Sequence, residues 1–187
     1  MNAKHIPNLI TLLRILLVPV VVWQIVYGQA WLALSLFLFA AISDGVDGYL
    51  ARRYGWRTRL GSILDPLADK LLMVSIFITL GWLLVVPFWF VLLVLVRDVV
   101  IIVGGIAYHM LVGKYSMAPS LISKINTTVQ MLLVSVLMVA PLWGMPDTLI
   151  QGLFYVAALT TVLSGINYVW VWGCRAAHHD RHMGASS

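Results

Sequence analysis

Long apolar runs separated by short polar segments dominate the chain. An α-helix needs about 20 apolar residues to cross a bilayer. Runs that approach this length lie at residues 6–27, 31–49, 63–85, 88–111, 121–143 and 148–172. The segments between the runs carry Gly, Pro or charged residues, which favour turns. The pattern therefore predicts an all-α integral membrane protein with six transmembrane helices.

The composition agrees with a membrane protein and excludes a water-soluble globule. Hydrophobic residues make up 61% of the chain and charged residues 10%, and the mean hydropathy is +0.96. A soluble domain usually has about 45–50% apolar and about 25% charged residues, so this chain has too little polar surface to coat a core. We expect a single six-helix membrane domain over residues 1–175 and a polar C-terminal tail over residues 176–187.

The basic residues indicate how the predicted helices are oriented. With six spans, the two termini and alternate loops share one side of the membrane. Every Lys and Arg lies on that side or within an apolar run, and the loops of the opposite side contain none; an excess of these residues marks the cytoplasmic side. We therefore expect both termini to be cytoplasmic and the membrane to be the inner membrane of a bacterium. The first apolar run has no small-x-small cleavage site, so we expect it to be a helix and not a cleaved signal peptide.

The net charge also bears on the partners of the chain. It is +5, and the basic residues flank apolar runs. In that position they suit anionic lipid headgroups, so we expect membrane lipids and no nucleic acid as partners.

Acidic residues carry the strongest signal for chemistry. All seven are Asp, and five of them fall in or beside apolar runs. A carboxylate in a membrane span costs about 2.5–3.5 kcal/mol on insertion scales, so it indicates function and needs a cation. Two pairs stand out, Asp44 with Asp47 and Asp65 with Asp69. Residues three or four apart share a helix face, and a short basic loop joins the two helices, so the four carboxylates are expected to converge.

Four carboxylates without His or Cys favour a hard divalent cation with oxygen ligands. Two ions would neutralise the cluster, and two ions about 3.5–4 Å apart recur in phosphoryl chemistry. Mg²⁺ or Mn²⁺ fits better than Zn²⁺, which prefers nitrogen and sulfur. The sequence thus predicts a polar metal site that faces the cytoplasm, with ligands Asp44, Asp47, Asp65 and Asp69.

Small and basic residues surround the aspartates. Gly48 and Ala51 fall on the helix face of the first pair, and Gly61 lies one turn before Asp65. Such residues either allow close helix packing or leave room for a ligand beside the metal. Arg52 follows Ala51 and has the geometry to bind a diphosphate through two parallel hydrogen bonds.

Residues 44–69 read DGVDGYLARRYGWRTRLGSILDPLAD. This segment resembles the signature of the CDP-alcohol phosphotransferases, D-x2-D-G-x2-A-R-x8-G-x3-D-x3-D, at all eight fixed positions and with every spacing. The wider resemblance covers nearly the whole chain, and IPNLITLLRILLVP at residues 6–19 looks like the first helix of that family. The resemblance implies an enzyme that transfers a phosphatidyl group from CDP-diacylglycerol to an alcohol and releases CMP.

The resemblance also implies roles for single residues. Asp44, Asp47 and Asp65 would bind metal, and Asp69 would contact metal and also deprotonate the acceptor alcohol. The residues that would hold the CDP-lipid are Asn8, Thr11, Gly48, Ala51, Arg52, Thr58 and Gly61. Members of the family are usually dimeric six-helix proteins with a cavity open to the cytoplasmic leaflet, so a homodimer is expected.

Three segments bear on the identity of the acceptor alcohol: residues 60–70, the Arg97-Asp98 pair and residues 119–130. All three look most like the CMP-forming cardiolipin synthases, which implies phosphatidylglycerol as the acceptor. Relatives that use glycerol 3-phosphate tend to have Arg-Glu at the pair and Lys in place of Asn126.

Charge gives this difference a physical meaning. Glycerol 3-phosphate is nearly a dianion, whereas the phosphodiester of phosphatidylglycerol carries one negative charge. Arg97 and Lys124 supply two cations, one of which Asp98 can hold. We expect Arg97, Lys124 and Asn126 to bind the acceptor, although an intramembrane ion pair and an interfacial lysine would explain the two cations equally well.

Two other functions remain open. A phosphatidylglycerophosphate synthase, which uses glycerol 3-phosphate, would share the signature and the six helices. A non-enzymatic cation transporter would explain the carboxylates in the membrane, but it would not explain Gly48, Arg52 and Gly61 at fixed spacing.

Overall fold

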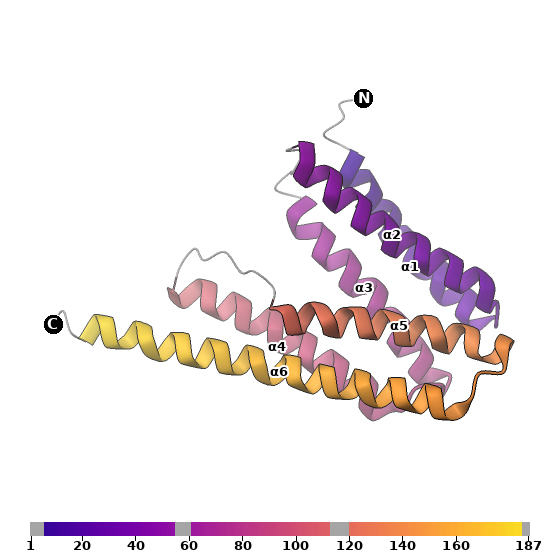
Figure 1. Ribbon diagram of the computed structural model, residues 1–187. Helices are drawn as coiled ribbons and strands as arrows, with labels where there is room; N and C mark the ends of the chain where they lie inside the picture. The colour runs from indigo at the N-terminus through magenta and orange to yellow at the C-terminus, as the bar shows by residue number, and fades with distance from the viewer. Residues whose placement is uncertain (1–5, 55–60, 113–119, 185–187) are drawn as a thin grey trace. The chain divides into compact units, whose positions relative to one another are not determined.

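A computed structural model gives the fold of the chain (Figure 1). It describes the backbone of residues 6–54, 61–112 and 120–184, and the side chains of residues 10–43, 45, 67–104 and 120–170. The described backbone forms α-helices and no strand. The helices are α1 (Ile6–Val26), α2 (Ala30–Tyr54), α3 (Gly61–Trp82), α4 (Phe88–Val112), α5 (Leu121–Trp143) and α6 (Asp147–Gly184). The all-α prediction is confirmed, and each predicted apolar run corresponds to one helix.

The helix ends differ from the ends of the apolar runs. The second run was predicted to end at Tyr49, but α2 continues to Tyr54, and α6 continues past Trp172 to Gly184. Backbone hydrogen bonding therefore extends beyond the apolar residues in both cases. The division into a membrane domain and a polar tail at residue 175 stays a prediction.

The end of α3 has an unusual capping residue. The amide of Val85 donates to the carbonyl of Leu80 at 3.0 Å and that of Leu84 to the carbonyl of Gly81 at 3.1 Å, the pair of bonds that defines a Schellman cap. Leu84 takes the left-handed position of this cap, with φ of 58°, where Gly is usual. α3 thus ends at Trp82 inside an apolar segment.

The chain forms two compact units. The first contains Met1–Pro87 and Val134–Met145, and the second contains Phe88–Leu133 and Pro146–Ser187. In the first unit α1 packs against α2 and α3, which also contact each other (Figure 1). In the second unit α4 packs against α6. The first part of α5 belongs to the second unit, and its last part belongs to the first.

The packed face of α1 explains how the first unit is held together. Thr11, Arg14, Val18 and Val21 are buried at intervals of three or four residues, the spacing of one helix face. Large apolar side chains of the other two helices, among them Phe37 and Phe77, are also fully buried. Each such side chain contributes about 1.5–3 kcal/mol when it is removed from water.

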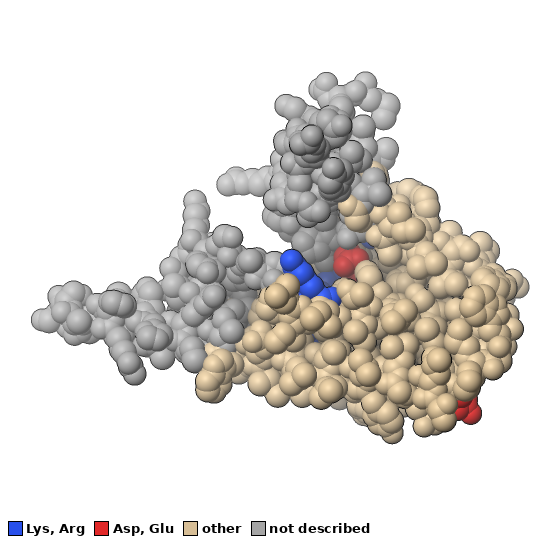
Figure 2. All heavy atoms as spheres, in the orientation of Figure 1, with Lys and Arg blue, Asp and Glu red and all other residues tan. Residues whose placement is uncertain are grey.

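The outer surface is apolar, as expected for a membrane protein. In the described part of the chain, the helices Leu121–Trp143 and Asp147–Trp170 are long and apolar enough to cross a membrane, and Ile10–Val26 and Ala30–Ser43 are shorter apolar helices. Figure 2 shows few charged atoms among the described residues on the face that it presents. Trp82 is 85% exposed, and soluble proteins rarely expose extensive apolar surface.

Candidate active site

The signature residues lie on two neighbouring helices of the first unit. Because α2 extends to Tyr54, it contains the first half of the signature, from Asp44 through Asp47 to Arg52. α3 contains Asp65 and Asp69. The helical backbone puts residues three, four and seven apart on one face, and α2 contacts α3. The two aspartate pairs therefore lie on helices that contact each other, and the convergence of the four carboxylates stays a prediction.

The metal site itself stays a prediction. The side chains of Asp44, Asp47 and Asp65 lie outside the described residues, as do those of Asn8, Gly48, Ala51, Arg52 and Gly61 and all of Thr58. Among the side chains that the structure does describe, no three His, Cys, Asp or Glu residues form a group that could hold a metal. The fit of a metal rests on the donor chemistry: four carboxylates on two helices in contact match the oxygen ligands of Mg²⁺ or Mn²⁺.

Asp69 is the one signature carboxylate whose side chain is described. It is half-buried on α3. Ala68 and Leu72, on either side of it along the helix, are each 1% exposed, so the carboxylate lies at the edge of the packed face. That position combines access with partial exclusion of water, which suits a group that exchanges protons. Its role as general base stays a prediction.

On α1, a buried cation accompanies one of the predicted CDP-lipid residues. Thr11 is fully buried and Arg14, one turn later, is 1% exposed. Arg14 was not among the residues predicted from the sequence to have a role. Its signal was available, because a charged residue within an apolar run is costly and needs a polar environment.

In the second unit, Arg97 and Asp98 form a buried ion pair on α4. The Nη1 atom of Arg97 donates to Oδ1 of Asp98 at 2.6 Å, and the two residues are 4% and 6% exposed. The pairing that the sequence suggested is confirmed. The same guanidinium donates from Nη2 to Ser123 Oγ on α5 at 2.7 Å and to Ser164 Oγ on α6 at 2.7 Å, and from Nε to Ser164 Oγ at 3.2 Å. Arg97 therefore connects three helices.

Asn126 belongs to a second polar cluster between α5 and α6. It is fully buried, and its Oδ1 accepts hydrogen bonds from the hydroxyls of Thr160 at 3.0 Å and Thr161 at 2.9 Å. Gln130 Nε2 donates to Thr161 Oγ1 at 3.1 Å. Lys124, by contrast, is exposed. The three predicted acceptor residues thus lie in the same unit but in different environments.

The polar residues of α6 were missed at the sequence level. Thr160, Thr161 and Ser164 share a helix face, and the partners on α5, which include Ser123 and Gln130, recur there at helical spacing. Ser and Thr in a helix usually bond to the backbone of the preceding turn, as both threonines also do toward Ala157. Polar residues at helical spacing on both α5 and α6 were the available signal that these two faces pack against each other.

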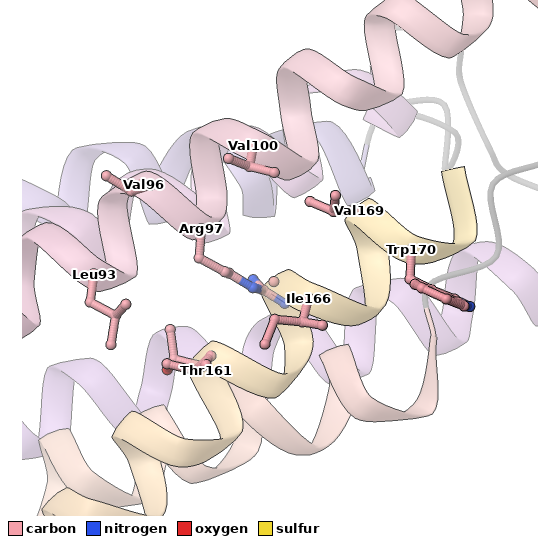
Figure 3. A pocket seen from close by; sticks show the side chains of 10 residues that line it. Leu93, Val96, Arg97, Val100, Thr161, Ile166, Val169 and Trp170 are labelled. Atoms are coloured by element: carbon pink, nitrogen blue, oxygen red, sulfur yellow. The ribbon is translucent and has the colours of Figure 1, made fainter. Parts of the chain in front are cut away.

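An apolar groove of about 680 Å³ lies between α4 and α6 (Figure 3). Its walls include Leu93, Val96, Val162 and Ile166, and the side chain of Arg97 extends from α4 toward α6 beside it. The volume falls in the range of small-molecule sites, about 300–1,000 Å³. A lining this apolar suits a hydrocarbon chain.

Comparison with known proteins gives consistent matches. A sequence model of the family described as CDP-alcohol phosphatidyltransferase matches residues 4–166. A probable cardiolipin synthase (CMP-forming) of Drosophila melanogaster is 36% identical over 90% of this chain and 58% of that protein. The cardiolipin synthase (CMP-forming) of Homo sapiens is 34% identical over 89% of this chain and 61% of that protein. A CDP-diacylglycerol–glycerol-3-phosphate 3-phosphatidyltransferase of Pectobacterium atrosepticum is 35% identical over 94% of this chain and 96% of that protein. The chain thus spans about three fifths of the two synthases and nearly all of the bacterial enzyme.

Proposed function

Because the chain belongs to the CDP-alcohol phosphatidyltransferase family, we propose that it transfers a phosphatidyl group from CDP-diacylglycerol to phosphatidylglycerol, which yields cardiolipin and CMP. The observation that carries the proposal is the complete signature on α2 and α3, two helices in contact. Transfer to glycerol 3-phosphate is the second candidate, and the relative from Pectobacterium atrosepticum, matched over 96% of its length, favours it.

The metal ions and the CDP-lipid are assigned to residues of the signature and of α1. Asp44, Asp47 and Asp65, with Asp69, would hold one or two Mg²⁺ or Mn²⁺ ions, which when bound neutralise charge on the diphosphate. The CDP-lipid would be held by Asn8, Thr11, Gly48, Ala51, Arg52, Thr58 and Gly61. The support is the match to the signature and the helical backbone that carries most of these residues.

The transfer itself needs a nucleophile, a base and a leaving group. The hydroxyl oxygen of the acceptor attacks the phosphorus that bears the diacylglycerol, and its proton passes to the carboxylate of Asp69. The bond from that phosphorus to the CMP oxygen breaks, and CMP leaves. Such a reaction depends mainly on positioning and on preorganised charge, which Arg52 on α2 would supply toward the diphosphate.

The residues proposed to bind the acceptor are Arg97, Lys124 and Asn126. The buried Asp98 already neutralises Arg97, so a single net cation, Lys124, remains to meet an acceptor phosphate. One cation matches the single charge of a phosphodiester. The apolar groove beside Arg97 also suits an acceptor with acyl chains.

The membrane topology follows from the same proposal. All six helices would cross the membrane as one domain over residues 1–175, with both termini in the cytoplasm and the metal site facing it. The strict distribution of Lys and Arg supports this orientation. A bacterial inner membrane and a homodimer complete the proposal.

The acceptor assignment predicts the outcome of a competition. Purified enzyme in vesicles that contain CDP-diacylglycerol, phosphatidylglycerol and glycerol 3-phosphate should form mainly cardiolipin, with one CMP released for each. The measurement is the amount of each lipid product, identified by its mass. Phosphatidylglycerophosphate as the dominant product would select the second candidate, and no CMP release with either acceptor would reject both.

Replacement of Asn126 tests the charge argument. Asn126→Lys places an additional cation in the cluster next to that of Arg97, so the ratio of kcat/KM for glycerol 3-phosphate to that for phosphatidylglycerol should rise about tenfold or more, the effect of about 1.4 kcal/mol. The variant also loses two hydrogen bonds from threonines and should be destabilised by about 1–3 kcal/mol.

Asn126→Met is the matched control, since it removes the same hydrogen bonds and adds no charge. It should lower stability to a similar degree without changing the ratio. An equal change of ratio in both variants would show that packing and not charge decides the acceptor.

A further inference from the structure

We propose that Arg97 is a positioning residue: its guanidinium ties α4, α5 and α6 together and thereby holds Lys124 where it meets the phosphate of the acceptor. The proposal rests on the proposed function, because it divides the acceptor side into a contact residue and the residue that places it. Its basis is the set of hydrogen bonds around Arg97.

Most N–H donors of Arg97 already have a partner within the protein. A guanidinium has five N–H groups, and four of them donate to Asp98, Ser123 and Ser164 at 2.6–3.2 Å. A bidentate contact with a phosphate needs two parallel N–H groups. Arg97 would have to give up a present partner to offer them.

Exchange of partners by Arg97 would be costly, because the ion pair is buried. Arg97 is 4% exposed and Asp98 is 6% exposed. Breaking a buried ion pair is strongly destabilising, so an acceptor phosphate that drew Arg97 away would have to compensate for the loss of its contact with Asp98. The pair therefore favours a fixed structural role.

The first turn of α5 connects Arg97 to Lys124. Ser120 caps this helix: its Oγ accepts from the amide of Ser123 at 3.2 Å, and its carbonyl accepts from the amide of Lys124 at 3.2 Å. A side-chain bond to the third helical amide is the usual N-cap geometry. Arg97 on α4 donates a hydrogen bond to the hydroxyl of Ser123. This bond fixes the orientation of the first turn of α5, which carries the exposed Lys124.

Arg97 is also held by a hydrogen-bond acceptor on α6. Ser164 is fully buried, and its hydroxyl accepts from both Nε and Nη2 of Arg97, which fixes the plane of the guanidinium. The next residue, Gly165, lies so close that a Cβ there would be 3.8 Å from Cγ of Arg97. This small residue allows α6 to pack against the stem of Arg97, so the orientation of the guanidinium is set from both sides.

The test compares three variants in vesicles: Lys124→Gln, Ser164→Ala, and the charge-neutral double variant Arg97→Gln with Asp98→Asn. Lys124→Gln should raise the KM for the acceptor about tenfold or more, with the KM for CDP-diacylglycerol unchanged, and Lys124→Arg should restore it. The double variant should raise the acceptor KM by a smaller factor. In addition, it should speed amide hydrogen exchange over residues 121–127, as should Ser164→Ala alone.

Ser35→Ala is the control variant. It removes an exposed hydroxyl that donates to the carbonyl of Trp31 in its own helix, and it should change neither the acceptor KM nor the exchange rate.

The double variant also serves as a background for Ser164→Ala. If Ser164 acts through Arg97, its replacement should have no additional effect on acceptor KM or exchange once Arg97 is Gln. An equal effect in both backgrounds would overturn the proposal. So would a double variant that raises the acceptor KM as much as Lys124→Gln while exchange over residues 121–127 stays at the wild-type rate.

Amide hydrogen exchange tests the role of Arg97 independently of the proposed enzymatic function. It is measured on the intact protein without any acceptor, so it reports on the tie even if the enzyme uses neither phosphatidylglycerol nor glycerol 3-phosphate. If the double variant does not fold, Ser164→Ala alone decides: unchanged exchange over residues 121–127 would refute the tie.

Discussion

Excess chelator is expected to abolish CMP release from CDP-diacylglycerol, and added Mg²⁺ or Mn²⁺ is expected to restore it. Four carboxylates on two contacting helices need positive charge, and a divalent ion with oxygen ligands supplies it. Asn at Asp44, Asp47 or Asp65 removes one negative ligand. Each variant should therefore need more metal for half-maximal activity and lose turnover by at least about 10²-fold, the scale of losing one preorganised electrostatic group.

The measurement is CMP release as a function of metal concentration for each variant. Asp147→Asn is the matched control, because Asp147 is an exposed carboxylate in the first turn of α6 and lies in the second unit. Its metal dependence should equal that of the wild type. Full activity in excess chelator would end the metal hypothesis, and so would Asn variants that lose turnover with unchanged metal dependence.

Asp69→Asn is expected to lower turnover by roughly 10²-fold or more, within the usual contribution of a general base. Asn retains the size of Asp but does not accept a proton at neutral pH. Binding of CDP-diacylglycerol should change much less, since three carboxylates of the cluster remain. Because Asp69 is only half-buried beside the packed Ala68 and Leu72, the substitution should leave the core intact.

Two quantities decide this prediction: the rate of a single turnover and the Kd of the CDP-lipid, both measured for the same preparation. A variant that keeps most of its turnover would place the base elsewhere. A variant whose Kd rises as much as its turnover falls would make Asp69 a metal ligand without a separate role in proton transfer.

The positions of the helices were predictable because each contains a long apolar run, and α5 begins and ends at the predicted residues. Some ends were not. α2 and α6 run on through polar residues, since hydropathy measures side-chain transfer while helix length depends on backbone hydrogen bonds. α3 ends earlier because Leu84 takes a cap position where the usual signal would be Gly.

The ion pair of Arg97 and Asp98 was predictable because the two residues are neighbours in the sequence. The helical period predicts that each aspartate pair shares one helix face, and the metal site built from the two pairs stays a prediction. The hydroxyls that hold Arg97 from α5 and α6 were not predictable in this way. Ser123 and Ser164 are 41 residues apart along the chain, and which helix faces meet is decided by packing in three dimensions.

The continuity of α5 has a consequence for how the sequence can change. The helix is about 34 Å long at 1.5 Å per residue, starts in the second unit and finishes in the first. Sharp bends in helices need Pro, Gly or an inserted turn, and its only Pro, Pro141, lies in the last turn. A single-residue insertion midway would turn one end by about 100° relative to the other. We therefore expect a single-residue insertion in the middle of α5 to disturb the protein more than a substitution at an exposed position of the same helix.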